Sequence, residues 1–248
     1  MNNMFDTYSR YYDILYQDKD YVAEVAYIRS ILARYGVVAG DLLELGAGTG
    51  KHAQLLVKCG YTVDGIERSA EMVAKIPVMT GLHCQQGDIR SFYMERSYDA
   101  VLSLFHVISY QTSNQDVQAV FARAAEHLKP GGIFVFDFWY SPAVYTQKPT
   151  TRVKRMFDEQ VEVTRVAEPF IYPNENRVDV NYTIFAKERA SNSVQTFAEL
   201  HPMRHFSLPE IDLFADVAGL KRVGAEEFLT GNEPSEMTWG VCVTLKKS

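Results

Sequence analysis

Cysteine is scarce in this sequence. Cys59, Cys84 and Cys242 are dispersed over 248 residues, and none belongs to a CxxC pair. A few unpaired cysteines are typical of proteins from a reducing compartment, and they exclude a small domain held together by disulfides. His, Cys and Asp residues also never cluster with the spacing of metal ligands, so we expect no metal site.

Long apolar runs are missing as well. No stretch approaches the roughly 18 apolar residues that a membrane-spanning helix needs. The opening segment, MNNMFDTYSRYYD, lacks the apolar region of a secretory signal. These two absences predict a cytoplasmic protein with no membrane partner.

The sequence also lacks an excess of positive charge. The chain has 25 Lys and Arg against 31 Asp and Glu, a net charge of −6. Because nucleic-acid-binding proteins usually present a basic face, we expect no nucleic-acid partner. Hydrophobic residues make up 47% and charged residues 23%, which is typical of a globular protein. With no internal repeats, the chain is expected to form one domain over residues 1–248.

Strand and helix patterns alternate over the first 140 residues or so. Short apolar runs bounded by glycines predict buried strands, and apolar residues at helical spacing predict the helices between them. This alternation predicts a parallel, doubly wound α/β sheet that binds ligands at the carboxyl ends of its strands. The predicted elements are helices at 20–35, 51–58 and 113–128, and strands at 42–45, 61–66, 82–86, 98–104 and 133–138.

The pattern changes to period two after about residue 151. We expect three antiparallel strands at 161–166, 177–185 and 194–206, with one wet face. Ser207 and Glu210 form a capping-box pattern for a helix ending at Gly219, and two closing strands follow. The predicted divisions are an aromatic helical lid at 1–36, a cofactor-binding core at 37–150, an antiparallel insert at 151–206 and the end of the core sheet at 207–248.

A glycine-rich loop follows the first predicted strand, where residues 42–50 are LLELGAGTG. A phosphate-binding loop fails here, because Leu45 and His52 stand where it needs Gly and Ser or Thr. A dinucleotide loop fails too, because Lys51 replaces its third glycine. Glu44 would repel a pyrophosphate but pair well with an amino group. The loop therefore points to S-adenosylmethionine, a zwitterionic nucleoside without phosphate; a glycine turn that binds nothing is the alternative.

Two further carboxylates follow the next strands. Glu67 ends the second strand, about 20 positions after the loop, where a carboxylate can accept hydrogen bonds from ribose hydroxyls. Asp88 follows the third strand and could accept from an adenine amine, with Ile89 against the ring. The alternatives are a charge at a helix N-terminus for Glu67 and an ordinary turn residue for Asp88.

This ordered set resembles the class I S-adenosylmethionine-dependent methyltransferases over nearly the whole chain. Residues 42–50 resemble the first motif of that family, residues 61–67 its ribose motif and residues 87–89 its adenine motif. The resemblance implies a Rossmann-like, seven-stranded sheet whose last strand is antiparallel. It also implies S-adenosyl-L-methionine as the cofactor, bound by Tyr16, Tyr21, Glu44, Gly46, Ala47, Gly48, Gly50, Glu67, Arg68, Met72, Asp88, Ile89 and Leu104.

Within the class, the chain looks most similar to the N,N-dimethyltransferases of nucleotide-linked amino sugars. That group has a Lys-Asp-Tyr-like element after an aromatic segment, here residues 19–21, and a Phe-rich segment after the fourth strand, here 104–110. It also has a Trp at the end of the fifth strand, here Trp139, and a Glu-x-His segment, here 199–201. The chain departs from the group at His106, where a small hydroxyl residue is usual, and it has Tyr110 where some members have histidine.

Two residues after the fourth strand are candidates for the reacting half of the site. His106 could act as the base that keeps an amine acceptor neutral; the alternative is a hydrogen-bonded pocket wall. Tyr110 could orient the acceptor through its hydroxyl; the alternative is a core aromatic. Trp139, His201 and Arg204 are expected to contact the acceptor, Arg204 by pairing with an acidic group or else as a solvated strand charge. His52, His83 and His127 are expected to be incidental.

Tyrosine is abundant in the opening segment. Tyr8, Tyr12 and Tyr16 recur every four residues and predict one stripe of a helix. The stripe could pack on the core, or it could form a lid whose hydroxyls contact the cofactor or the acceptor and exclude water. The resemblance favours the lid, with Tyr8 and Tyr12 on the acceptor.

Several functions stay open on these residues. The leading expectation is methyl transfer from S-adenosylmethionine to a small acceptor, with an amino group of a nucleotide-linked sugar as the candidate. The alternatives are an O- or N-methyltransferase of another metabolite, an NAD-dependent oxidoreductase, and a non-catalytic nucleoside-binding module. A homodimer is possible if the edge of the insert pairs two subunits.

Overall fold

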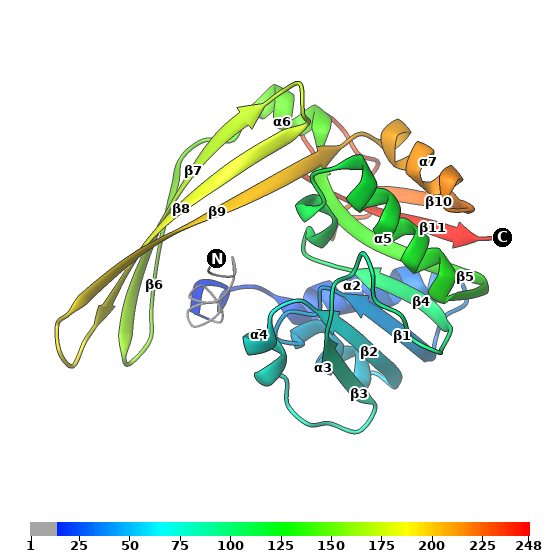
Figure 1. The fold of residues 1–248 in the computed structure, drawn as a ribbon, viewed down its shortest axis with the longest axis horizontal. Helices are drawn as coiled ribbons and strands as arrows, with labels where there is room; N and C mark the ends of the chain where they lie inside the picture. The colour runs from blue at the N-terminus through cyan, green and yellow to red at the C-terminus, as the bar shows by residue number, and fades with distance from the viewer. Residues whose placement is uncertain (1–13) are drawn as a thin grey trace.

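The computed structural model describes residues 14–248, whose centre is a twisted sheet of parallel strands (Figure 1). The parallel strands lie in the order β3-β2-β1-β4-β5, and β11 then β10 continue the sheet beyond β5 in antiparallel pairings. These seven strands form the methyltransferase-like sheet that the resemblance implies. Their bounds are β1 (Gly40–Leu45), β2 (Tyr61–Glu67), β3 (Leu82–Gln86), β4 (Tyr98–Ser103), β5 (Leu128–Tyr140), β10 (Leu220–Glu227) and β11 (Gly240–Lys247).

Helices cover both faces of this sheet, because the core strands are apolar on both sides. Leu42 of β1 packs in one cluster with α2 and α3, whereas Leu43 and Leu45 pack in the other cluster with α5 and α7. Each fully buried leucine contributes roughly 1.5–3 kcal/mol of transfer free energy. The helices are α2 (Tyr21–Arg34), α3 (Lys51–Lys58), α4 (Ala70–Ala74), α5 (Asn114–His127), α6 (Ser141–Gln147), α7 (Leu208–Val217) and the 3₁₀ turn η1 (Val107–Tyr110). Within residues 14–248, no helix is long and apolar enough to cross a membrane.

Three of the helices show how far their capping residues could be predicted. The Asp20 carboxylate accepts from the backbone nitrogen of Ala23 at 2.9 Å at the start of α2, and Ser113 caps α5 as expected. The capping box expected for α7 is wrong, because Ser207 makes no side-chain capping bond. Glu210 instead pairs with Arg204, 2.5 Å away.

The insert is an antiparallel sheet that extends away from the core at the carboxyl end of β5 (Figure 1). It contains four strands, β6 (Arg152–Phe157), β7 (Val161–Tyr172), β8 (Arg177–Glu188) and β9 (Val194–Phe206), one more than expected. β6 was not predicted because neither face of its sequence, RVKRMF, is wholly apolar. The end of β9 pairs in parallel with the end of β5, Trp139 opposite His205 and Tyr140 opposite Phe206.

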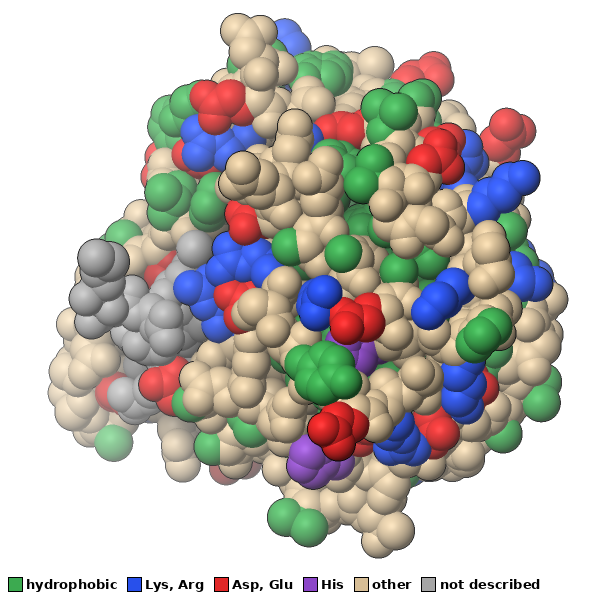
Figure 2. All heavy atoms as spheres, turned by 45° about the vertical axis from the view of Figure 1, so that its right-hand side comes forward, with side chains coloured by type: hydrophobic (Ala, Val, Ile, Leu, Met, Phe, Trp, Pro, Cys, Tyr) green, Lys and Arg blue, Asp and Glu red, His purple; other side chains and the backbone are tan. Residues whose placement is uncertain are grey.

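Charges of both signs are interspersed on the surface. Figure 2 shows one face, on which Lys and Arg side chains lie among Asp and Glu side chains. Many of these charges are paired, as between Arg222 and Asp212 at 2.6 Å. Exposed pairs of this kind contribute roughly 0–1 kcal/mol each and do not determine the fold.

Candidate active site

The glycine loop joins the carboxyl end of β1 to α3. Gly46, Gly48 and Gly50 all have positive φ, of 76°, 56° and 71°, which side chains rarely adopt. A Cβ on Gly46 would also lie 2.6 Å from Cγ1 of Val107, so the residue must be glycine on two grounds. The space beside Gly48 is open, with no atom within 4 Å of an added Cβ. The loop therefore leaves room for a ligand to approach its backbone.

Glu67, at the end of β2, is fixed by the backbone around it. Its Oε2 accepts from the nitrogen of Gly48 at 2.9 Å, and its Oε1 accepts from the nitrogen of Ser69 at 2.8 Å. The residue is only 7% exposed. Each oxygen keeps a second lone pair, so this carboxylate is oriented in advance to accept hydrogen bonds from a ligand.

Glu44 is a deeply buried carboxylate, 1% exposed, and its Oε2 has no hydrogen-bond partner. Burial raises the pKa of Glu44 to about 7, although the nearby charges of His52 and Lys19 act in the opposite direction. Nδ1 of His52 lies 3.6 Å from Glu44, and Nε2 of the same ring lies 2.7 Å from Glu24. Lys19 completes the chain, 2.6 Å from Glu24. A buried carboxylate with an unmet oxygen is suited to a cationic ligand group.

Asp88 lies at the carboxyl end of β3, but its carboxylate is not vacant. Arg90 donates to both oxygens, at 2.9 and 2.5 Å, and also bonds Asp116 of α5 at 2.8 Å. The hydrogen bonds from Arg90 lower the pKa of Asp88 despite partial burial. The sequence pattern predicted that Asp88 accepts from an adenine amine; in the structure its carboxylate is already paired with Arg90, so its remaining lone pairs are the ones available for that contact.

The segment after β4 has an unusual backbone. Phe105 and His106 both have positive φ, 66° and 61°, without being glycine. A left-handed residue of this kind costs roughly 1–2 kcal/mol. Asp137 on β5 stabilises the arrangement, because its Oδ2 accepts from the backbone nitrogen of His106 at 3.1 Å and lies 2.7 Å from Nδ1 of the ring. Burial would raise the pKa of Asp137, but His106 outweighs it and the pKa falls.

Tyr110 ends η1 and begins a relay of three polar side chains. Its hydroxyl lies 2.9 Å from Nδ1 of His201, and Nε2 of His201 lies 3.1 Å from Oε2 of Glu199. Because a carboxylate only accepts, Nε2 carries a proton, and Nδ1 of the neutral ring then accepts from the Tyr110 hydroxyl. Burial raises the pKa of Tyr110 well above its usual value, so it remains a phenol.

These groups surround a cavity of about 600 Å³, the main cavity, at the carboxyl ends of the strands and beneath the insert. It is lined on one side by the glycine loop and on the other by the segment that follows β4, by η1 and by the insert. The residues expected at the site that line it are Tyr16, Tyr21, Gly46, Ala47, Gly48, Glu67, Arg68, Met72, Asp88, Ile89, Leu104, His106, Tyr110 and Trp139.

Other expected residues lie elsewhere. Glu44 of β1 and Gly50, the last glycine of the loop and the N-cap of α3, do not line the main cavity, and His201 lies behind Tyr110. Arg204 is a correction: it is 7% exposed, bonds Glu210 and Asn114, and belongs neither to the cavity wall nor to the solvated surface. The expected acceptor contacts Tyr8 and Tyr12 lie outside the described residues.

Comparison with known proteins places the chain in a family. A model described as a methyltransferase domain matches residues 42–132. A dTDP-3-amino-3,4,6-trideoxy-alpha-D-glucopyranose N,N-dimethyltransferase from Streptomyces venezuelae is 30% identical over 216 residues, which cover 85% of this chain and 88% of the relative. The chain belongs to the S-adenosylmethionine-dependent methyltransferases. This membership confirms the family, fold class and cofactor predicted above, and it excludes the NAD-dependent oxidoreductase.

Further relatives agree with this methyltransferase in sequence or in fold. A dTDP-3-amino-3,6-dideoxy-alpha-D-glucopyranose N,N-dimethyltransferase from Streptomyces fradiae is 28% identical over 89% of this chain and 84% of its own. The structure of a sugar N-methyltransferase from a Streptoalloteichus species aligns with a TM-score of 0.81 at 21% identity, over 100% of this chain and 94% of that one. At that identity the structure shows a shared fold.

The residues of the methyltransferase fit its cofactor. The carboxylate of Glu67 is oriented in advance at the cavity wall, open space adjoins Gly48, and Glu44 places a buried carboxylate oxygen without a hydrogen-bond partner behind that wall. We expect Glu67 to bind the ribose hydroxyls. We expect Glu44, which lies behind His52 at the cavity wall, to stabilise the positively charged amino group of the methionine end through its negative charge.

The structure also reveals site residues of the methyltransferase that the sequence pattern missed. Arg152, Arg165 and Tyr182 reach the main cavity from three strands of the insert, and Lys51 and His52 reach it from the start of α3. His52 was expected to be incidental, yet it lines the cavity and links Glu24 to Glu44. Its position next to the glycine loop was the one signal that could have identified it.

Proposed function

We propose that this protein methylates the amino nitrogen of a sugar linked to a nucleotide. The relatives from Streptomyces venezuelae and Streptomyces fradiae are both N,N-dimethyltransferases of dTDP-linked amino sugars by name. They align with this chain over 85% and 89% of its length, which is more than the cofactor-binding core alone.

The observation that carries this proposal is a pair of arginines in the acceptor half of the main cavity. Arg152 of β6 and Arg165 of β7 both line it. The Arg165 guanidinium lies over the ring of Tyr182, 4.7 Å from its centroid, and donates to the Tyr16 hydroxyl at 3.3 Å. Guanidinium groups at a cavity wall match the geometry of phosphate oxygens, and a nucleotide-linked sugar has a diphosphate.

For this reaction the protein needs to align the acceptor nitrogen with the methyl group and to provide a proton acceptor. The cofactor supplies a methyl group on a sulfonium, which an amine attacks in line once it is neutral. His106 is the proposed base. Asp137 lies against its Nδ1, so Nε2 is the nitrogen that can take a proton, and the buried carboxylate stabilises the imidazolium that forms.

Tyr110 has the complementary role of orienting the acceptor. Its proton is directed to His201, so its oxygen presents lone pairs to the main cavity. An amine that donates an N–H to this oxygen has its own lone pair turned away from Tyr110, toward the centre of the site. The acceptor half therefore favours a nucleophile that carries at least one hydrogen.

The test is a direct assay with a panel of acceptors. The protein is incubated with S-adenosylmethionine and one of four acceptors: a dTDP-linked 3-amino sugar, a dTDP-linked 4-amino sugar, the matching free amino sugar or a small phenol. The masses of the products are then measured by mass spectrometry. One or two added methyl groups on a nucleotide-linked amino sugar support the proposal. Methylation of the free amine or the phenol alone overturns it in favour of another small acceptor. Calorimetry with S-adenosylhomocysteine alongside shows whether binding without turnover fits a non-catalytic module.

Two further expectations are kept as proposals. We propose that the protein works in the cytoplasm, supported by free Cys59, Cys84 and Cys242. We also propose a homodimer that pairs through β6, the strand at the outer edge of the insert, where the side chains of Val153 and Phe157 are 51% and 64% exposed. Sedimentation analysis of the wild type and of Phe157→Lys tests the dimer, which the lysine should weaken.

A further inference from the structure

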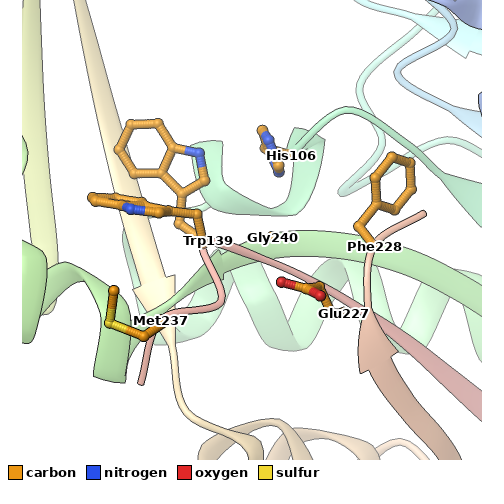
Figure 3. Close-up of a pocket in the computed structure, with 7 residues that line it drawn as sticks. His106, Trp139, Glu227, Phe228, Met237 and Gly240 are labelled. Carbon is orange, nitrogen blue, oxygen red and sulfur yellow. The ribbon is translucent and has the colours of Figure 1, made fainter. Parts of the chain in front are cut away.

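A second cavity, the side cavity, adjoins the main cavity on the far side of His106. It has a volume of about 370 Å³ and lies between the end of β5, the end of β10 and the start of β11 (Figure 3). His106 and Trp139 line both cavities. The residues that line the side cavity are His106, Trp139, Glu227, Phe228, Met237, Trp239 and Gly240.

Aromatic rings form most of its wall. The rings of Trp139 and Trp239 stand perpendicular, at 87°, with centroids 6.1 Å apart. The ring of His106 lies 6.2 Å from that of Trp139 at 66°. Nε1 of Trp239 donates to Oε1 of Gln147 at 2.8 Å, which fixes the ring in place. Rings that meet at such angles offer both faces and edges to one occupant, and the faces are negative.

One carboxylate joins these rings. Glu227 ends β10, and Figure 3 shows its side chain between Trp139 and Phe228. Its Oε2 accepts from the hydroxyl of Thr230 at 2.6 Å, and its Oε1 accepts from that of Thr238 at 3.4 Å. The bond from Thr230 lowers the pKa of Glu227, so the carboxylate is ionised at neutral pH. No Lys or Arg is among the residues that line the side cavity.

We propose that the side cavity is a binding site for a small alkylammonium cation. Indole and phenyl faces attract a diffuse positive charge, and a carboxylate at the same wall makes the site selective for cations over neutral molecules of equal size. A compact cation, such as Na⁺ or the primary ammonium group of a lysine, is more strongly hydrated and matches apolar walls less well. The cavity has room for an ion of tetramethylammonium size, and its open rim at Met237, which is 64% exposed, lets the ion enter.

The shared wall gives this site a position from which it could affect the acceptor half. An occupant of the side cavity would contact the faces of His106 and Trp139 that are turned away from the main cavity. The proposal does not depend on which acceptor is methylated, because none of Glu227, Phe228, Met237, Trp239 and Gly240 lines the main cavity.

The chain has two tryptophans, and both line the side cavity, so intrinsic fluorescence can report on the site. The protein is titrated with tetramethylammonium chloride at constant ionic strength, and in parallel with tert-butanol, a neutral molecule of similar shape. We expect a saturable change with the cation, half complete at millimolar concentration as suits a weak site, and no saturation with the alcohol. Equal responses to the two probes, or no saturable response to the cation, would overturn the proposal. This comparison needs no variant.

Three variants locate the response. Glu227→Gln should weaken the apparent affinity about 10-fold, the loss of one favourable charge contact. Glu233→Gln, an exposed carboxylate in the same loop that lines neither cavity, should leave it unchanged. Trp139→Phe leaves Trp239 as the fluorescent reporter, and Trp239 lines the side cavity but not the main cavity. Equal effects of the two Glu variants would contradict the proposal. Loss of the saturable response in Trp139→Phe would also contradict it, provided that near-ultraviolet circular dichroism shows Trp239 in its native environment.

Discussion

Oδ2 of Asp137 lies 2.7 Å from Nδ1 of His106 and 3.1 Å from its backbone nitrogen, so one buried oxygen orients both the ring and the strained backbone of the same residue. His106 follows β4 and Asp137 lies near the end of β5, and the parallel pairing of these two strands brings the residues together. The sheet thereby positions the proposed base.

His106→Gln is expected to lower kcat about 100-fold, the usual contribution of a positioned base, while the affinity for S-adenosylhomocysteine stays the same. The loss should shrink at high pH, because the acceptor amine then loses its proton to solvent unaided. Rate profiles from pH 6 to 10 and calorimetry on the same variant measure both effects. Full activity at pH 7 would remove the base role and leave His106 as a wall residue.

Glu44→Gln is expected to weaken S-adenosylhomocysteine binding about 10–100-fold, as the loss of a buried charged contact does. Burial raises the pKa of Glu44 from 4.5 to about 7. The folded ligand-free protein therefore binds more protons than the unfolded chain between those values, and its stability falls as pH rises from about 4.5 to 7. Urea titrations at several pH values should show this loss in the wild type and a flatter profile in Glu44→Gln. An unchanged profile would refute the assignment.

Glu199→Gln and Tyr110→Phe should each raise KM for the acceptor, because each breaks the same relay. The double variant should be no worse than the more damaging single one, since the residues act as a unit. If Glu199→Asp restores the KM, the effect of Glu199 is to orient His201 and not merely to fill space. Additive increases in KM for the two single variants in the double-mutant cycle would mean that Tyr110 acts without His201.

Arg152→Ala should raise KM for a nucleotide-linked acceptor about 10-fold, the value of one charge-assisted contact, with a smaller effect in high salt. Arg155 provides a matched control on the opposite face of β6, where it is exposed and does not line the main cavity. Kinetics of Arg152→Ala and Arg155→Ala over a salt series measure the difference. Equal KM values in the two variants would argue against a phosphate contact.

Arg204→Met should destabilise the protein by about 3–5 kcal/mol, because it leaves Glu210 without the partner that offsets its partial burial. Cofactor affinity should not change. The double variant Arg204→Met, Glu210→Leu should recover most of the stability, since both charges are then gone. Chemical denaturation and calorimetry distinguish this structural role from the acceptor contact that the strand pattern predicted.

The cofactor half could be predicted from the sequence because its parts are local. Glu67, Asp88 and the glycine loop each follow a strand directly, and parallel strands bring their carboxyl ends to one edge. The acceptor half could be predicted only in part: His106, Tyr110 and Trp139 follow or end core strands and line the main cavity as expected. Arg152, Arg165 and Tyr182 could not be predicted, because they reach the cavity through the register of the antiparallel insert, which links residues far apart in sequence. The partner of Arg204 is likewise set by packing between β9 and α7.

The insert joins the core sheet through only a short pairing of β5 with β9. Two residues, Trp139 and Tyr140, connect its ladder to the core, whereas the strands that position the glycine loop, Glu67 and Asp88 lie entirely within the core. Exchange of β6–β8 with those of a relative could therefore redirect the enzyme to another acceptor in one step and leave the methyl donor site unchanged. In evolutionary terms, such a chain can explore new substrates without first losing its cofactor.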